Sequence, residues 1–355
     1  MRGWAIMFIA LHNFFHLEEF GLAQENETLF SLERTSIFFQ NLFSCDQPLI
    51  GNLFSFIGWC GVPVFVFFSG YGLSKKYGKE NKIEIVAYLK HSYLKLFCLI
   101  LPAAIFFLVY RAFFVSLGSV ALGCVSLTFL NTLVPGLGSI APPFWYFSLT
   151  FQLYILYILL FRIKDWRKLA GIGVLFFLIY IILSPDFYPN AAILKYIRLN
   201  FIGWLTVFIL GLIIGHYKHN KNENEVLSGL ENNILFRWLA LVIMVLCFAG
   251  LFLVNKSYYS WILLPFVSLC FFYSFTIAIE KIPLLNTMSI WLGKKSSYVF
   301  VAHPIALLAM QWILKVSVFS EIHLYVISTI YTALFILIAI LYENIHIWIS
   351  KKLLK

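Results

Sequence analysis

Charged side chains are scarce in this sequence of 355 residues, at 12% of its composition. Soluble domains use about 25%. Hydrophobic residues account for 61% of the chain, and no polar segment is long enough to form a second, soluble domain. This balance excludes an ordinary soluble protein and predicts a single membrane-embedded domain over residues 1–355.

Several motifs that mark well-known enzyme classes are also missing from the sequence. It contains no Gly-x-Ser-x-Gly elbow, no Walker loop and no His-x-x-x-x-Asp pattern. The six cysteines show no Cys-x-x-Cys spacing and lie mostly in apolar runs, so buried packing is favoured over redox or metal chemistry. We therefore predict no metal site.

The apolar runs that dominate the chain predict an all-α bundle of about ten transmembrane helices. The first, residues 1–16, is expected to be retained and not cleaved as a signal peptide, because His12, Asn13 and His16 interrupt its apolar run. A polar segment follows to about residue 50 and is expected to form an outer loop with some amphipathic helix. The other spans are predicted near residues 51–74, 96–117, 144–161, 169–184, 200–216, 238–254, 260–279, 296–316 and 323–347.

Basic residues outnumber acidic ones, 26 to 16, which gives a formal net charge of +10. Such an excess can indicate nucleic-acid binding, but it also arises when Lys and Arg gather in cytoplasmic loops. With the amino terminus inside, all basic residues fall in cytoplasmic segments except Arg34, Arg111, Lys195, Arg198, Lys256 and Lys315. This distribution predicts that both termini are cytoplasmic and explains the charge without nucleic acid.

The first helix carries ionisable groups at a depth where hydrocarbon cannot solvate them. Arg2 stands at its start, and His12 follows at a helical distance of about 15 Å, near the middle of a bilayer core. His12 and His16 are four residues apart and share one face, with Asn13 beside them. This face fits either a polar contact between helices or a general base that takes a proton from a hydroxyl.

Two further segments carry polar groups in apolar surroundings. His303, followed by Pro304, lies eight residues beyond Lys295 and is expected to reach a depth similar to that of His12. A packed core histidine explains it equally well. In the second span, Phe67-Phe-Ser-Gly-Tyr-Gly-Leu73 offers the Ser69 hydroxyl beside two glycines that suit a close helix crossing.

Four segments in order resemble the acyltransferase-3 family of bacterial membrane acyltransferases, over nearly the whole chain. The first helix, Arg2-Gly-Trp-Ala-Ile…His12, is similar to the family's arginine-to-histidine motif, and Gly61–Leu73 is similar to its Phe-x-x-Ser-Gly-Phe/Tyr run. Pro143-Phe-Trp-Tyr-Phe-Ser-Leu149 resembles its Trp-Phe-Leu span, and Gly293-Lys-Lys-Ser296…His303 its Gly-x-x-Ser…His segment.

The sequence departs from the family pattern in places. Nine residues separate Arg2 from His12 where ten are usual, a rotation of about 100° on a helix, so either His12 or Asn13 occupies the usual histidine place. Lysines, among them Lys90 and Lys95, replace the arginines at the entry to the third span. Glu343 resembles a late Glu-x-Pro motif whose proline is missing here.

The resemblance implies transfer of an acyl group, most often acetyl, from cytoplasmic acyl-coenzyme A to a hydroxyl of a surface polysaccharide or lipid-linked sugar. The protein would then be a multi-pass protein of the bacterial inner membrane. His12, Arg2 and His303 are the expected catalytic residues. The expected substrate-binding residues are Ser69, His16, Asn13, Lys95, Trp145 and Ser296.

A cationic inner mouth formed by Arg2, Lys75, Lys76, Lys90 and Lys95 suits an anionic donor, although ordinary cytoplasmic enrichment of lysine explains it as well. The alternative function is a transporter or flippase for a glycan or lipid, which would use the same buried polar groups as a pathway. The sequence shows no fixed-period repeat and no inverted symmetry between its halves, which disfavours a secondary transporter.

Overall fold

The computed structural model describes residues 1–17, 32–44, 49–80, 82–134, 137, 139–183, 196–220, 234–316 and 323–353. Every regular element within these ranges is an α-helix or a short 3₁₀ turn, and no strand occurs among them. The helices of the first half are α1 (Arg2–Phe15), α2 (Leu32–Ser44), α3 (Leu49–Ile57), α4 (Val62–Tyr77), α5 (Ile85–Phe114), α6 (Leu117–Ser126) and α7 (Trp145–Leu160), with 3₁₀ turns η2 (Gly58–Gly61), η3 (Asn131–Leu133) and η4 (Pro142–Phe144).

The second half of the chain is also helical. Its helices are α8 (Trp166–Ile182), α10 (Phe201–Asn220), α12 (Ile234–Leu253), α13 (Tyr258–Trp261), α14 (Leu264–Ile279), α15 (Pro283–Val316) and α16 (His323–Leu353), with the 3₁₀ turn η5 (Val254–Lys256) before α13. The helix α15 continues through Pro304.

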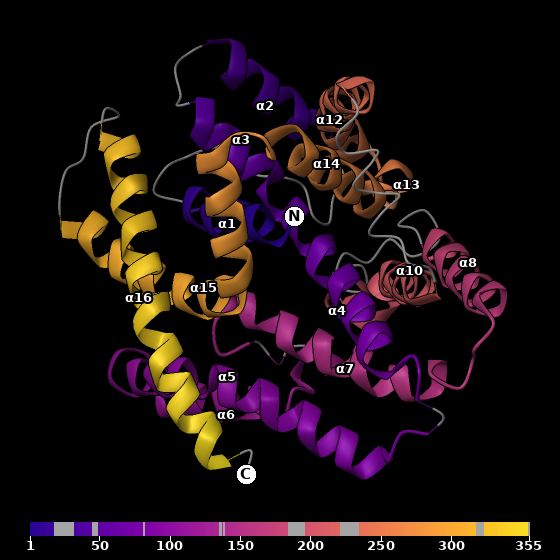
Figure 1. Ribbon diagram of the computed structural model, residues 1–355. Helices are drawn as coiled ribbons and strands as arrows, with labels where there is room; N and C mark the ends of the chain where they lie inside the picture. The colour runs from indigo at the N-terminus through magenta and orange to yellow at the C-terminus, as the bar shows by residue number, and fades with distance from the viewer. Residues whose placement is uncertain are drawn as a thin grey trace.

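Two hydrophobic cores organise the bundle (Figure 1). The first joins α4 to α10, α10 to α8, and α12 to α14. The second joins α1 to α15, α15 to α16, and α16 to α5. Helix α7 contributes to both, through Leu153 in the first core and Phe147 in the second. The candidate site lies along this seam, because Val62, Phe65 and Tyr146 pack against both cores.

Glycines allow α4 and α10 to pack backbone to backbone. A Cβ atom on Gly70 would lie 2.2 Å from the carbonyl oxygen of Phe208, and one on Gly211 would lie 2.1 Å from that of Phe67. No larger residue fits at such distances, so the small residues are required here. The crossing predicted at the Ser-Gly-Tyr-Gly segment is therefore present at Gly70, whereas a Cβ atom on Gly72 would meet none of the described residues within 4 Å.

Within the described residues, six helical stretches are long and apolar enough to cross a bilayer, by length and composition. They are Leu49–Tyr77, Ile85–Phe114, Pro142–Leu160, Ile234–Leu253, Pro283–Leu314 and Leu324–Leu353. Three shorter apolar helices, Leu117–Ser126, Phe201–His216 and Leu264–Ile279, accompany them. The described residues of the ten predicted ranges are mostly helical, although 51–74 is divided among α3, η2 and α4, and 260–279 between α13 and α14. The count of ten spans and the cytoplasmic termini stay predictions.

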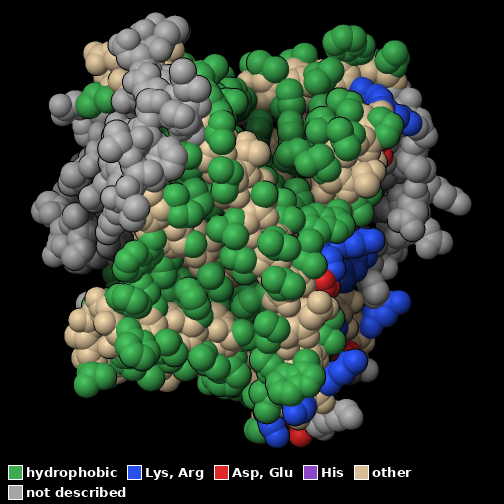
Figure 2. All heavy atoms as spheres, turned by 90° about the vertical axis from the view of Figure 1, so that its left-hand side faces the viewer, with side chains coloured by type: hydrophobic (Ala, Val, Ile, Leu, Met, Phe, Trp, Pro, Cys, Tyr) green, Lys and Arg blue, Asp and Glu red, His purple; other side chains and the backbone are tan. Residues whose placement is uncertain are grey.

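The outer surface of the bundle is apolar where α16 faces outward. Figure 2 shows hydrophobic side chains covering most of one face, with Lys and Arg gathered along one side of it. On α16 the exposed hydrophobic residues include Val326, Ile330, Leu337, Ile340, Leu341 and Trp348. An apolar patch of this extent suits contact with lipid chains and not with water.

A buried polar network ties α7 to the segment before it and to the start of α10. The Gln152 amide nitrogen donates to the Thr132 hydroxyl and to the Asn200 side-chain oxygen, each at 2.8 Å, and its oxygen accepts from the backbone N–H of Phe201 at 3.1 Å. One turn earlier on α7, Ser148 donates to Asn131 at 2.5 Å. Because each of these groups is paired, the network stabilises the bundle at little desolvation cost.

Candidate active site

Two neighbouring cavities lie between α1, α4, α7 and α15. The small cavity has a volume of about 160 Å³ and is lined by His12 and Asn13 of α1, Trp59 of η2, and Trp145 of α7, among others. The large cavity has a volume of about 510 Å³. Its lining includes Arg2, Ser69, Lys76, Lys95, Lys294, Ser296 and His346.

His12 is held at the small cavity by the close approach of α1 and η2. A Cβ atom on Gly58 would lie 2.5 Å from the Cβ atom of His12, so only glycine permits this packing. The His12 side chain is 8% exposed, and its Nδ1 lies 3.1 Å from the carbonyl oxygen of Phe54. Because a carbonyl oxygen only accepts, Nδ1 carries the hydrogen, and neutral His12 has its lone pair on Nε2. That nitrogen is able to act as a base.

Asn13 connects the small cavity to His303. Its Nδ2 donates to the carbonyl oxygen of Ile9 at 2.9 Å and lies 3.2 Å from Nε2 of His303. Since the amide nitrogen has two hydrogens, the second one points to an unprotonated Nε2, and Nδ1 of His303 donates to the Val299 carbonyl at 3.2 Å. The tautomer of His303 is thereby fixed.

The large cavity is cationic. Arg2, Lys76, Lys95 and Lys294 line it, and no Asp or Glu is among its described lining residues. The guanidinium of Arg2 lies 5.6 Å from the centre of the Phe68 ring, which holds that charge near the cavity. Lys75 and Lys90, which the sequence placed in the same cationic mouth, do not line the cavity. The cavity therefore offers several positive charges to a polyanionic ligand.

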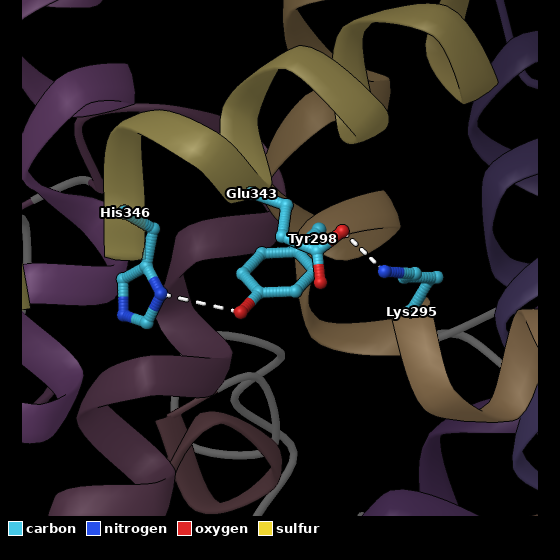
Figure 3. A network of polar contacts seen from close by, with 4 residues as sticks. All are labelled: Lys295, Tyr298, Glu343 and His346. Atoms are coloured by element: carbon cyan, nitrogen blue, oxygen red, sulfur yellow. Dashed lines mark hydrogen bonds and ion pairs between the residues drawn. The ribbon is translucent and has the colours of Figure 1, made fainter. Parts of the chain in front are cut away.

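One wall of the large cavity is braced by contacts between α15 and α16 (Figure 3). Glu343 pairs with Lys295, so its negative charge is already balanced by a lysine outside the cavity lining. Tyr298 and His346, which both line the cavity, are joined by a hydrogen bond of 3.3 Å between the hydroxyl and Nδ1. Ser350 lies 3.1 Å from the other ring nitrogen of His346. These contacts fix the imidazole ring at the cavity wall.

Three aromatic residues, Phe65, Tyr146 and Phe300, line both cavities and are named here the aromatic barrier. Their ring centroids are 5.2 Å apart for Tyr146 and Phe300, 6.3 Å for Phe65 and Tyr146, and 6.5 Å for Phe65 and Phe300. Rings at these distances are in contact. The barrier therefore separates the cationic cavity from the cavity of His12.

The structure distributes the predicted site residues over the two cavities. His12, Asn13 and Trp145 line the small one, whereas Arg2, Ser69, Lys95 and Ser296 line the large one. His303 and His16 line neither. His303 is fully buried behind Phe300, with ring centroids 5.7 Å apart, and the His16 ring lies 4.7 Å from that of His12.

Sequence reasoning missed several lining residues. The barrier residues lie within the segments that resemble the family, but nothing singled them out there, because phenylalanine and tyrosine are abundant along the whole chain. His346 stands three residues after Glu343, a spacing that places both on one helix face and offered a usable hint. Trp59 lines the small cavity, and its buried Nε1 has no hydrogen-bond partner among the described residues.

Cysteines and acidic residues play no visible part in the cavities. Cys60 and Cys98 are buried as predicted, but Cys124 and Cys270 are exposed on apolar helices. No group of three or more His, Cys, Asp or Glu side chains able to hold a metal ion occurs within the part of the chain that the structure describes. The polar chemistry of the cavities comes from histidine, amide, hydroxyl, lysine and arginine groups.

The helical, lipid-facing bundle and its pair of cavities define a membrane protein with a buried site. The family model of the acyltransferase-3 type, described as an acyltransferase domain, matches residues 1–342, and the chain belongs to that family. No curated protein and no solved structure matches the chain. Membership of the family indicates a membrane acyltransferase.

Proposed function

We propose that the protein transfers an acetyl or other short acyl group from acyl-coenzyme A to a hydroxyl of a surface polysaccharide or lipid-linked sugar, at the bacterial inner membrane. The observation that carries this proposal is the pairing of a cationic cavity with a histidine-lined cavity across one aromatic barrier. Family membership supports acyl transfer over the transporter or flippase alternative, which no feature of the described residues favours.

The large cavity is the proposed donor site. Acyl-coenzyme A carries several phosphate charges, and Arg2, Lys76, Lys95 and Lys294 lie around this cavity without an acidic neighbour in its lining. Most basic residues are expected on the cytoplasmic side, so this cavity would open toward the cytoplasm, where the donor is made. Gly72, with open space around it, leaves room for the pantetheine arm.

The small cavity is the proposed acceptor site, with His12 as general base. Nε2 of His12 takes the proton of the acceptor hydroxyl, whose oxygen then attacks the thioester carbonyl carbon. The new C–O bond forms, the C–S bond breaks, and the imidazolium returns its proton to the departing thiolate. Trp59 Nε1–H is the candidate donor to the carbonyl oxygen that becomes negative during attack.

The test is acyl transfer from radiolabelled acetyl-coenzyme A into glycan by membranes that contain the parent protein or His12→Ala. Loss of a general base is expected to reduce transfer about 10²- to 10⁴-fold at equal membrane expression. His216→Ala is the matched control, because His216 lines a separate cavity of about 30 Å³. Equal transfer by the parent and His12→Ala would show that His12 is not the base.

A further inference from the structure

The aromatic barrier forms a wall that the two cavities share. Phe65, Tyr146 and Phe300 come from α4, α7 and α15, and all three are shared by the two linings. In the proposed reaction, an acyl group passes from the cationic cavity to His12 beside these rings. The space beyond them is only about 160 Å³, less than a third of the volume on the cationic side.

The neighbours of the barrier limit how far its rings can move. Phe300 is 6% exposed and packs edge-on against Phe147, with centroids 5.5 Å apart, as well as against His303. The Tyr146 hydroxyl lies 3.5 Å from the Ser69 hydroxyl on α4. Core neighbours thus restrict the ring of Phe300, and the contact with Ser69 restricts Tyr146. Close-packed side chains of this kind shift little to accommodate a ligand that is too large.

We propose that Phe65, Tyr146 and Phe300 determine the length of the acyl group that the protein transfers. The inference rests on the proposed function, in which the phosphates occupy the large cavity and the thioester reaches the barrier. A short acyl group places its carbonyl carbon near His12 within the small cavity. Each additional methylene lies on the side of the carbonyl away from the sulfur and must find space in the rest of the small cavity, which the three barrier rings line, so one methylene is expected to change kcat/KM about 10- to 200-fold.

The decisive experiment compares acetyl-, butanoyl- and octanoyl-coenzyme A as donors for the parent protein, Phe300→Ala and Tyr146→Ala. The quantity measured is the ratio of kcat/KM for the octanoyl donor to that for the acetyl donor. Removal of either ring joins the cavities, so this ratio is expected to rise at least about tenfold. An unchanged ratio in both variants, with acetyl transfer retained, overturns the proposal.

The matched control is Phe151→Ala, on the same helix as Tyr146. Phe151 packs against Tyr93 and Phe129, at 5.8 Å between centroids in each case, and lines neither cavity. Its removal creates a comparable defect in the core without opening the barrier. The length preference is expected to stay that of the parent, and a shift as large as that of Phe300→Ala would overturn the proposal.

Binding measurements separate this proposal from the proposed function and do not depend on turnover. The unreactive S-ethyl and S-octyl thioethers of coenzyme A are titrated into purified parent protein, Phe300→Leu and Tyr146→Leu, which retain more of the side-chain volume. Tighter S-octyl binding in the variants alone supports the proposal. The length assignment alone is overturned if the variants also exclude the S-octyl compound, or if the parent binds both thioethers with equal affinity. If neither compound binds, the proposed donor site is overturned too.

Discussion

Asn13 joins α1 to α15 because both hydrogens of its amide nitrogen are used. One goes to the Ile9 carbonyl within its own helix, and the other points to Nε2 of the fully buried His303. Without the amide of Asn13, Nε2 of His303 would be a buried acceptor without its donor. The Val299 carbonyl cannot take the place of the amide, because it accepts a hydrogen bond from the other ring nitrogen, Nδ1. The contact therefore serves both the packing of the two helices and the orientation of His303.

A double-mutant cycle measures this contact. Asn13→Ala is expected to lower the free energy of unfolding by about 1–3 kcal/mol, because it leaves His303 Nε2 unsatisfied. When His303→Ala is made in the same chain, the two losses are expected to be non-additive, with a coupling of about 0.5–1.7 kcal/mol. Unfolding in detergent, followed by tryptophan fluorescence, provides the values; strict additivity would contradict the contact.

Polar residues inside apolar helices were the predictable part of the site. His12, Asn13, Ser69 and Lys95 stand out in the sequence because hydrocarbon cannot solvate them, and each lines one of the cavities. His303 drew attention for the same reason but lies behind the barrier, which no spacing reveals. The barrier residues could not be found in this way, since any of 38 phenylalanines fits an apolar core.

At the scale of helices, the crossing of α4 and α10 depends on glycine. A Cβ atom on Gly211 would lie 2.1 Å from a backbone carbonyl oxygen, which cannot move aside as a side chain can. Gly211→Ala is therefore expected to destabilise the bundle by about 1–3 kcal/mol through overpacking. The measurement is the midpoint of thermal unfolding in detergent at equal protein concentration.

Gly171→Ala on α8 is the control for this effect. A Cβ atom at Gly171 would meet no atom of another described segment within 4 Å, so the same substitution is expected to be neutral or to stabilise the helix slightly. Equal unfolding midpoints for the two variants would mean that α4 and α10 do not approach this closely.

Helix existence was predictable, but helix ends were not. Hydropathy started the third and ninth spans at residues 96 and 296, whereas α5 begins at Ile85 and α15 at Pro283. Polar residues end an apolar run without ending a helix, because backbone hydrogen bonds continue into the polar region. The predicted span over residues 260–279 is divided between α13 and α14 for a related reason: an apolar run does not show where the backbone turns.

At the scale of the whole molecule, the sequence predicted a membrane protein, because amino-acid composition determines this class. Exposed apolar side chains on α5, α12 and α16 suit a lipid environment, and Figure 2 shows apolar side chains over much of one face. The sequence did not predict which segments lie beside one another in space. Gln152 lies beside Asn200 and Thr132, and Arg2 lies near Lys294 at one cavity, although nothing in the separation of these residues along the chain predicts it.

The distribution of lysines over the molecule yields a test that separates a donor site from general cytoplasmic enrichment. Lys76 and Lys95 line the large cavity, whereas Lys90 is also exposed on α5 but does not line it. Lys76→Ala and Lys95→Ala are each expected to raise KM for acetyl-coenzyme A about two- to fivefold, because exposed charge contacts contribute modestly, and to weaken its dependence on salt. Lys90→Ala is expected to leave both unchanged. If all three variants behave alike, the lysines act only through the overall field of the protein and the large cavity does not bind the donor phosphates.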